Sequence, residues 1–458
     1  MGTEAKKGKI NLFEMVAYGF GGFGRGMFNA IAMGQLNYFY TNSLGLSAAV
    51  VGMVFMLSRF FDSFTDVLVG ALVDKTKSRF GKARIWLLCT CIPFGIGTYL
   101  LFTVPQSWGP SGQLIYIIIT YNLCTSILGT TWYVPHMTLP ARMTKDQGER
   151  AQITNINQIF AMLSTLPFSM ILFPQIVANG NTQEAWVSAM KLYAVVGVIA
   201  MGICAVFAKE HVDEEKPAKK QPAEKIPFGK MFKALITNKY WVMILLIFIF
   251  DAMSNNFANA AATYYSQYLL GDATVISRAN LYITAALVIV LFGATPFVKK
   301  YGKRKIFILG SVIKFIGILI MGILPVSSSV TVASRVIEAF GRGFHYATMY
   351  AMVPDAMEYG EWKTGIRVEG TMMSACSLGA KIGVGFGPGF AGIIMDAAGF
   401  DGLLTVQPAA ALTAINACLV WIPLVFAAGL IVLGFLYKLD DQYDEIVAEL
   451  ARRKSAAF

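Results

Sequence analysis

The segment from Ser58 to Arg84, SRFFDSFTDVLVGALVDKTKSRFGKAR, decides the fold. Its first part is mostly apolar but carries Arg59, Asp62 and Asp66, and its second part is a polar turn rich in Lys and Arg. Lys and Arg collect in the cytoplasmic loops of membrane proteins. The segment is therefore typical of a membrane helix that ends at the cytoplasmic surface, with three charges inside it that need an explanation.

The composition of the whole chain also indicates a membrane protein. Of its 458 residues 56% are hydrophobic and 14% are charged, whereas soluble domains carry about 25% charged residues. A membrane helix needs about 20 largely apolar residues, and such stretches are too long for barrel strands. The expected spans are 12–40, 46–72, 84–105, 113–136, 150–178, 186–209, 237–270, 276–298, 304–325, 328–357, 367–396 and 407–437. The predicted fold class is an all-α membrane protein with twelve transmembrane helices in two six-helix bundles.

The loops between these spans alternate in charge. Basic residues gather at the N-terminus and in the turns 74–84, 141–150, 215–225 and 299–305, while the intervening loops hold one basic residue, Arg278. We therefore expect a multi-pass protein of the cell (inner) membrane with both termini in the cytoplasm and membrane lipid as a partner. The net charge of +11 is divided among separate loops, which argues against a nucleic-acid partner.

A charged, Pro-containing stretch divides the chain and is typical of a linker. It predicts an N-terminal bundle at 1–208, a cytoplasmic linker at 209–228, a C-terminal bundle at 229–437 and a cytoplasmic tail at 438–458. A basic turn with a Gly follows the second helix of each half, which indicates an internal repeat. Two related bundles with a site between them are the architecture of many secondary transporters.

The three charges of the opening segment are expected on one helix face, because Arg59, Asp62 and Asp66 are spaced i, i+3 and i+7. A charge at the bilayer centre costs about 2.5–3.5 kcal/mol on insertion scales. Two carboxylates one turn apart also repel each other unless a Na⁺, a proton or a basic side chain lies between them. The alternative is a structural Arg–Asp clamp.

Other polar side chains fall inside the expected spans. Lys381, in the span 367–396, is a candidate positive partner for the two acids when no cation is bound. The remaining ones are Arg25, Asn29, Asp251, Asn255, Arg342, His345 and Tyr346. Such a polar and aromatic lining suits a ligand with many hydroxyls, although each residue alone is also explained by an interhelical hydrogen bond.

Two glycine-rich stretches, 19–24 and 383–389, have the composition of phosphate loops but lack the preceding strand and the Lys–Ser/Thr ending. They predict sites where helices approach closely or bend. The six cysteines lie in apolar runs without a C-x-x-C spacing and are expected to be small core residues. The sequence has no metal-cluster, nucleophile or nucleotide signature, so we expect no enzyme activity and no cofactor.

Three motifs carry a family resemblance. The stretches YGFGGFG at 18–24, RFFDSFTDVLVGALVDKTKSRFGKAR at 59–84 and VPDAMEYGEWKTGIRVEG at 353–370 resemble the glycoside–pentoside–hexuronide:cation symporters. That family includes melibiose permease and lies within the major facilitator superfamily. The resemblance covers essentially the whole chain. It implies the major facilitator fold, alternating access and import of a sugar-like solute with a co-transported Na⁺ or H⁺.

The resemblance also implies roles for single residues. Asp62 and Asp66 match the cation site, which would hold Na⁺ as a metal if the protein is sodium-coupled, with the Thr130 hydroxyl beside them. Lys381 and Arg59 match basic positions involved in coupling. Arg25 matches a basic position of the first helix.

Departures from the family pattern concern the substrate. Gly26 and Tyr133 stand where melibiose-type members have aspartates, Gln158 stands at an arginine position, and Tyr346 stands at a tryptophan position. Two acids are thus missing while Arg342 is present with His345, which favours an acidic sugar, a hexuronide or a sulfonated sugar. A neutral glycoside or pentoside, a lipid-like solute, a non-transporting membrane receptor and a membrane enzyme are the alternatives.

Overall fold

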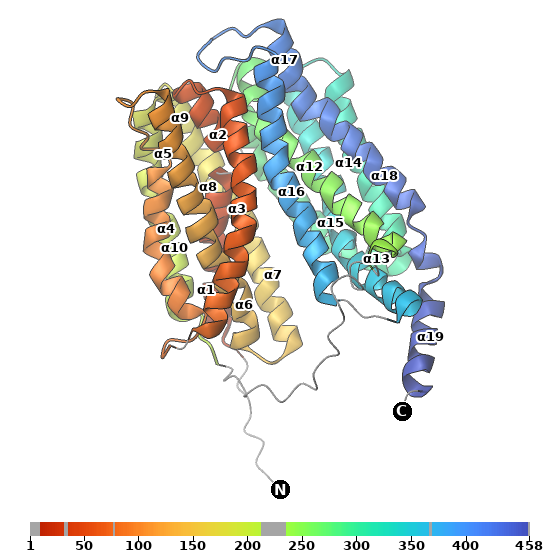
Figure 1. Ribbon diagram of the computed structural model, residues 1–458. Helices are drawn as coiled ribbons and strands as arrows, with labels where there is room; N and C mark the ends of the chain where they lie inside the picture. Colours follow the sequence, from red (N-terminus) through yellow and green to blue (C-terminus); the bar gives the residue numbers. More distant parts are fainter. Residues whose placement is uncertain (1–9, 32–34, 77, 212–234, 366–368, 457–458) are drawn as a thin grey trace. The chain divides into compact units, whose positions relative to one another are not determined.

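The structure is a computed structural model that describes residues 10–31, 35–76, 78–211, 235–365 and 369–456 (Figure 1). These residues are predominantly helical and contain no β-strand. By its contacts the chain divides into two compact units. Unit 1 comprises Met1–Leu46 and Leu57–Ala218, and unit 2 comprises Ser47–Met56 and Lys219–Phe458. Most of the linker expected at 209–228 and the end of the tail expected at 438–458 lie outside the described residues.

Unit 1 is a bundle of long helices, several of which are continued through a π-helical turn. Its elements are α1 (Leu12–Ala30), α2 (Leu36–Tyr38), most of α3 (Ala48–Lys75), α4 (Arg84–Leu100), α5 (Pro110–Asn122), α6 (Gly129–Met143), α7 (Gln147–Leu163), α8 (Thr165–Pro167), α9 (Phe173–Ala178) and α10 (Gln183–Phe207). The π-helical turns are Phe39–Ser43, Leu123–Leu128 and Phe168–Leu172. Within the unit α1 packs against α7 and α10, and α4 packs against α10 and α6.

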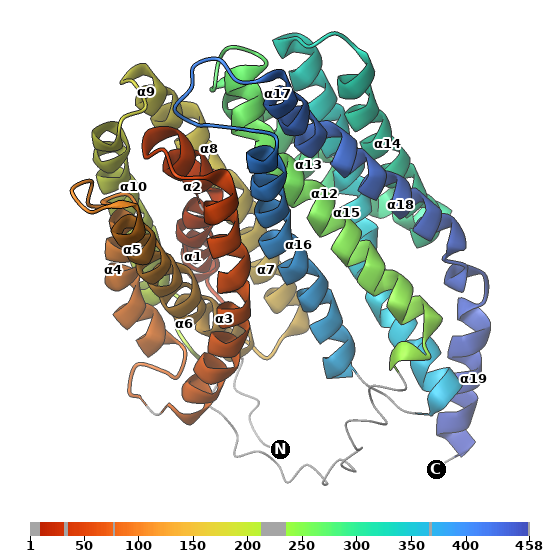
Figure 2. The same cartoon turned by 45° about the horizontal axis from the view of Figure 1, so that its top comes forward.

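Unit 2 has the same all-helical construction (Figure 2). Its elements are α12 (Lys239–Tyr268), α13 (Val275–Tyr301), α14 (Lys303–Ile323), α15 (Ser328–Thr364), α16 (Glu369–Ala397), α17 (Ala409–Asn416), α18 (Ile422–Leu436) and α19 (Tyr443–Ala456). A π-helical turn, Ala417–Trp421, joins α17 to α18. Here α15 packs against α13 and α14, and α12 packs against α16 and α18.

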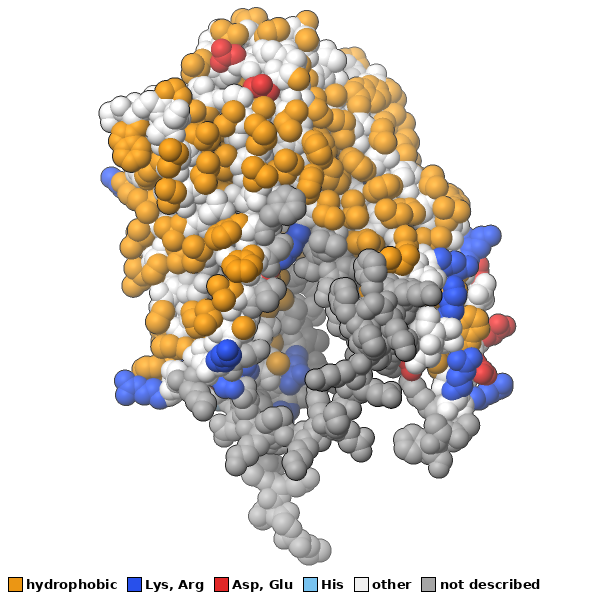
Figure 3. Space-filling model, in the orientation of Figure 1, with side chains coloured by type: hydrophobic (Ala, Val, Ile, Leu, Met, Phe, Trp, Pro, Cys, Tyr) orange, Lys and Arg blue, Asp and Glu red, His pale blue; other side chains and the backbone are white. Residues whose placement is uncertain are grey.

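The outward faces of the helices are apolar. Large hydrophobic side chains such as Phe64 and Val425 are 66% and 70% exposed. Hydrophobic side chains cover most of the upper part of the visible face, while most of the visible Lys and Arg side chains lie in its lower part (Figure 3). Such patches on a soluble protein would mark interaction surfaces. Seven helical stretches of the described residues are long and apolar enough to cross a membrane, and Arg84–Leu100 and Val275–Leu291 are shorter apolar helices.

The basic turn of unit 1 is organised by Glu210, which follows α10. Its carboxylate accepts hydrogen bonds from the backbone N–H groups of Ala83 and Arg84 at 2.8 and 3.0 Å. The Arg84 guanidinium in turn donates to the carbonyls of Ala205 and Val206 at 3.2 and 2.6 Å. These bonds supply partners for orphan groups at the N-terminus of α4 and the C-terminus of α10.

The basic turn of unit 2 repeats this arrangement. Asp440, after α18, accepts from the backbone N–H of Arg304 at 2.9 Å, and the Arg304 guanidinium donates to the carbonyls of Gly434 and Phe435 at 3.2 and 2.8 Å. A glycine with positive φ precedes each capped helix, Gly81 at +103° and Gly302 at +86°. The matching contacts support the internal repeat that the sequence predicts.

The glycine-rich stretches are sites of close helix packing, as the sequence predicts. In the stretch 19–24, a Cβ on Gly21 of α1 would lie 2.5 Å from Nε2 of His136 on α6. In the stretch 383–389, a Cβ on Gly387 of α16 would lie 2.7 Å from that of Asn256 on α12. Side chains at these positions would push the helices apart.

Close helix packing also explains why a glycine stands at position 26. A Cβ at this position would overlap the Ser164 hydroxyl and would lie 2.9 Å from the Ala161 carbonyl. The aspartate that melibiose-type proteins carry at the matching position would therefore not fit between α1 and the end of α7. The absence of that acid thus has a packing cause in this protein.

We predict that Gly81→Ala destabilises unit 1. The residue has φ of +103°, and a Cβ there would overlap the Glu210 carboxylate, so we expect a loss of about 1–3 kcal/mol and a lower apparent Tm of the purified protein in detergent. The control is Gly202→Ala in α10, where a Cβ would meet open space. An equal change in apparent Tm for both variants would contradict the capping role.

Candidate functional site

The acids of α3 are not equivalent. Asp62 is buried, and its Oδ2 accepts from Nη1 of Arg59 at 2.6 Å while its Oδ1 accepts from the hydroxyl of Ser126. The other terminal nitrogen of Arg59 donates to the hydroxyl of Tyr121 at 2.8 Å. The Arg–Asp clamp considered from the sequence is therefore formed at Asp62.

Asp66 lies one turn further along α3 and is half-buried. Its Oδ1 accepts from the Thr130 hydroxyl at 3.0 Å. The Arg25 guanidinium interacts electrostatically with Asp66 and lies 3.8 Å from the ring centroid of Tyr133. The structure thus brings together four residues singled out in the sequence, Asp66, Thr130, Arg25 and Tyr133. With Arg59 and Asp62 they form the unit 1 set, which holds two positive and two negative charges.

The hydroxyl partners come from a single helical pass. Ser126 lies in the π-helical turn Leu123–Leu128 and Thr130 in the first turn of α6. Their spacing of four residues equals that of Asp62 and Asp66, so two carboxylate–hydroxyl pairs stack between the same two helices. π-Helical turns are frequent at functional sites. Ser126 was missed in the sequence, although this shared spacing was the signal for it.

This arrangement gathers oxygen atoms, which are the ligands that hard cations prefer. At this site in unit 1, the oxygen atoms that could bind a cation are those of the Asp62 and Asp66 carboxylates and of the Ser126 and Thr130 hydroxyls. Among the described residues no group of three or more His, Cys, Asp or Glu side chains is arranged to hold a metal ion. A cation at this site would accordingly rely on the acid pair and the hydroxyls.

A second buried polar cluster lies in unit 2. Lys314 of α14 is fully buried and donates to Oδ1 of Asp251 at 2.9 Å and to Oδ1 of Asn255 at 3.3 Å. The Asn255 amide donates to Oδ2 of Asp251 at 3.0 Å and to the Tyr346 hydroxyl at 3.2 Å. Nε2 of His345 lies 3.6 Å from Oδ1 of Asp251. Three helices, α12, α14 and α15, therefore meet at one carboxylate.

The cluster continues along α15. Glu338 lies between two arginines, with 2.8 Å to Nη1 of Arg335 and 3.8 Å to Nη1 of Arg342. The Nε atoms of both arginines are buried without a hydrogen-bond partner in the described structure. With Lys314 and Asp251 the cluster has three positive and two negative charges when its histidine is neutral. We call these residues, together with His345, Asn255 and Tyr346, the unit 2 cluster.

Three members of the unit 2 cluster were not predicted from the sequence, namely Lys314, Arg335 and Glu338. The signal for Lys314 was present, since it is a lone charge in an apolar helix as Lys381 is. Arg335 and Glu338 are the eighth and eleventh residues of α15, and the spacing of these opposite charges at i, i+3 was the signal for them.

Three further residues were singled out in the sequence. Asn29 is half-buried on α1, and Gln158 is exposed on α7. Lys381 is half-buried on α16. Its pairing with Asp62 and Asp66 stays a prediction, because those acids belong to the other unit.

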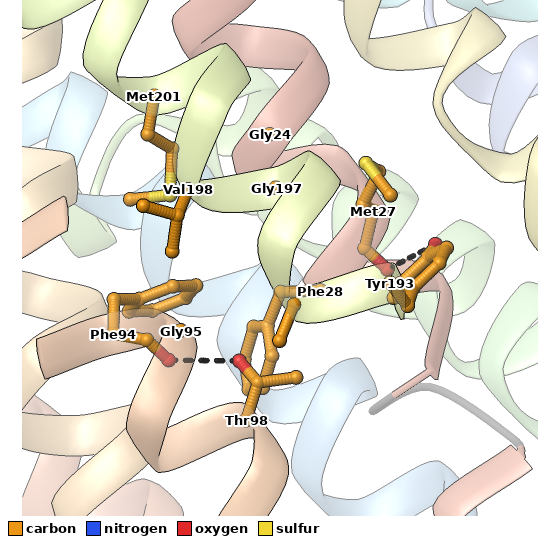
Figure 4. Close-up of a pocket in the computed structure, with 11 residues that line it drawn as sticks. Gly24, Met27, Phe28, Phe94, Gly95, Thr98, Tyr193, Gly197, Val198 and Met201 are labelled. Carbon is orange, nitrogen blue, oxygen red and sulfur yellow. Dashed lines mark hydrogen bonds between the residues drawn. The ribbon is translucent and has the colours of Figure 1, made fainter. Parts of the chain in front are cut away.

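Unit 1 also contains a small cavity between α1, α4 and α10 (Figure 4). Its lining is mostly apolar, with Phe28, Phe94, Val198 and Met201, and includes two residues that carry a hydroxyl, Thr98 and Tyr193. The cavity offers about 10 Å³, which is room for about one water molecule. It is too small for a sugar.

Comparison with known proteins places the chain in a family. The family model described as MFS/sugar transport protein matches residues 17–441. The chain belongs to this family. The isoprimeverose transporter of Lactiplantibacillus pentosus is 29% identical over 98% of this chain and 93% of that protein. The putative sulfoquinovose importer of Escherichia coli (strain K12) is 26% identical over 98% of this chain and 95% of that protein.

The fold also matches a solved transporter. The crystal structure of a bacterial homologue of the human lysosomal transporter Spinster, in an inward-facing and unoccupied conformation, has a TM-score of 0.67 at 15% identity and covers 95% of this chain and 97% of that one. The protein is therefore an all-α, multi-pass membrane protein of the major facilitator fold. It is a symporter-type transporter for sugar-like solutes and not an enzyme.

We predict that the Lys314–Asp251 pair behaves as a buried ion pair. Lys314→Met leaves a buried carboxylate without its cation and should cost about 3–5 kcal/mol. The double variant Lys314→Met/Asp251→Asn removes both charges and should recover most of the loss. Apparent Tm values in detergent measure both effects, with Arg453→Ala at the exposed Glu449 pair as a control that loses less than about 1 kcal/mol. A double variant that is less stable than Lys314→Met would contradict the prediction.

Proposed function

We propose that this protein imports an acidic sugar or glycoside, such as a hexuronide or a sulfonated sugar, together with Na⁺ or H⁺ by alternating access. The observation that carries the proposal is a difference in charge between the two sets of buried residues. The unit 1 set is balanced, two positive against two negative charges, and the unit 2 cluster has one positive charge in excess. A buried excess charge is costly and is matched when an anion binds.

The acids of α3 are the side chains that would bind the coupling cation. Asp66 is the better candidate ligand, because it is half-buried, whereas Asp62 is buried against Arg59 and Ser126. The Thr130 hydroxyl donates to Asp66 and can turn its oxygen toward a bound Na⁺. A proton would neutralise the same carboxylate. Either ion leaves Arg25 and Arg59 with less opposing charge, so cation binding changes the electrostatics of the whole set.

Arg342 is the side chain that would bind the acidic group of the substrate. This side chain is 13% exposed, whereas Lys314 and His345 are fully buried. A guanidinium binds carboxylate or sulfonate through charge-assisted hydrogen bonds. The relative described as a putative sulfoquinovose importer agrees with this interpretation. Asn255, Tyr346, Arg25, Asn29, Tyr133 and Gln158 stay candidates for the hydroxyl groups of the sugar.

A neutral glycoside or pentoside is the second candidate substrate. It is favoured by the relative described as an isoprimeverose transporter. In that case Glu338 would remain the permanent partner of Arg342, and the excess charge would have another role.

The membrane topology follows from the basic loops. We place both termini in the cytoplasm of a cell whose inner membrane holds the protein, because the turns at 74–84 and 299–305 are rich in Lys and Arg. Import down a cation gradient then requires that cation and substrate stabilise the same occluded state. Each must tighten binding of the other by the same factor.

We predict that Asp66→Asn abolishes cation-driven accumulation of sugar in vesicles. The variant keeps the shape of the side chain but removes the charge that a cation would neutralise, so exchange of sugar at equal concentrations should persist. Glu449→Gln at the exposed end of the chain is the control and should accumulate sugar normally. Full accumulation by Asp66→Asn would contradict the coupling role.

We predict that Arg342→Ala lowers uptake of an acidic sugar far more than uptake of its uncharged analogue. A hydrogen bond to a charged group contributes about 1.5–3 kcal/mol, so apparent affinity for glucuronate should fall about 10- to 100-fold while that for glucuronamide changes little. Arg342→Lys should lie between Arg342→Ala and the native protein. Equal losses for the two sugars would favour the neutral glycoside.

A further inference from the structure

One ring nitrogen of His345, Nε2, has no hydrogen-bond partner among the described residues. Its ring is fully buried, and Nδ1 lies 3.3 Å from the Ser311 hydroxyl. We assign the proton of the neutral ring to Nδ1, because that hydroxyl is placed to donate to the Phe307 carbonyl at 2.9 Å and can then accept from Nδ1–H. In a neutral imidazole the other nitrogen is then an acceptor.

The acceptor nitrogen faces another acceptor. Nε2 lies 3.6 Å from Oδ1 of Asp251 and has no hydrogen-bond partner among the described residues. Two acceptors at this separation repel when both are unprotonated. One proton between them would convert the contact into a charge-assisted hydrogen bond.

The groups around His345 define what this proton would change. Lys314 on α14 and Asp251 on α12 are the charged side chains that act on it. On its own helix Arg342 and Glu338 lie one and two turns away, and Tyr346 follows it directly. From α13, which also packs along α15, the side chain near this level is the aliphatic Val290. A proton on His345 would raise the net charge of the unit 2 cluster from +1 to +2.

We propose that His345 and Asp251 together bind one proton when an anionic sugar binds at Arg342. The proposal rests on the acidic substrate of the proposed function and adds a proton site in unit 2 that is separate from the acids of α3. The proton sits between Nε2 and Oδ1, and Lys314 donates to the same oxygen at 2.9 Å while Asn255 donates to Oδ2. The added positive charge attracts the carboxylate or sulfonate, and the anion in turn favours protonation.

The coupling has a measurable consequence. Proton and anion must each tighten the binding of the other by the same factor. Affinity for an acidic sugar should therefore rise as pH falls, by up to about tenfold per pH unit for one linked proton. A sugar carboxylate stays ionised between about pH 5.5 and 7.5, so the protein must supply the titrating group.

The test is equilibrium binding of glucuronate and of glucuronamide to the purified full-length protein between pH 5.5 and 7.5 at constant Na⁺. We expect a steeper pH slope for glucuronate than for glucuronamide in the native protein, and equal slopes for the two sugars in His345→Gln, because a coupling proton at Asp66 would act on both sugars alike. The matched control is His211→Gln, since His211 is an exposed histidine paired with Glu14, and it should keep the native slope. Equal slopes for the two sugars in the native protein, or an unchanged difference between them in His345→Gln, overturn the proposal.

A second measurement needs no variant. Infrared difference spectra of protein with isotope-labelled histidine, recorded on adding glucuronate at pH 6.5, should show a histidine becoming protonated. Spectra without that change overturn the proposal. Failure of the proposed function would be seen elsewhere, as an absence of accumulation under both a Na⁺ and a pH gradient with either sugar.

Discussion

The structure depends on one constraint, which is that charges buried in a membrane-spanning bundle must be compensated. On α3 this is achieved locally, because Arg59 and Ser126 bind Asp62 while Thr130 binds Asp66. In unit 2 it is incomplete, since Asp251 and Glu338 face three basic side chains. A transporter can use buried charges that its own side chains do not fully neutralise. An ion or a substrate then supplies the missing opposite charge in one step of the transport cycle.

The rest of the fold positions these clusters. Glycines let α1 approach its neighbours in unit 1 and let α16 approach α12 in unit 2. Carboxylates after α10 and α18 bind the first turns of α4 and α14 in the same way. The two units thus share a means of fixing helix ends, while their buried polar residues differ. We infer that the repeated contacts carry stability and that the unshared residues carry the chemistry.

Sequence reasoning predicted the fold well and the site partly. Long apolar stretches and alternating basic loops suffice for membrane helices, because the bilayer leaves few other solutions. Asp62 and Asp66 were singled out by their spacing and Thr130 by the family resemblance, and their role as a cation site stays a prediction. Ser126 and Lys314 were not singled out, since a hydroxyl or a single amine barely changes hydropathy and its role depends on which helix it faces. Helix pairing is set by packing, which a single sequence does not display.

The account makes the cation and the sugar interdependent, and reciprocity of their binding is its most direct test. Calorimetric titration of the purified protein would give the affinity for an acidic sugar with and without saturating Na⁺ or at low and high pH, and the affinity for that cation with and without sugar. The account predicts that one of the two cations tightens sugar binding and that sugar tightens binding of that cation by the same factor. Sugar affinity that is independent of both cations would contradict it.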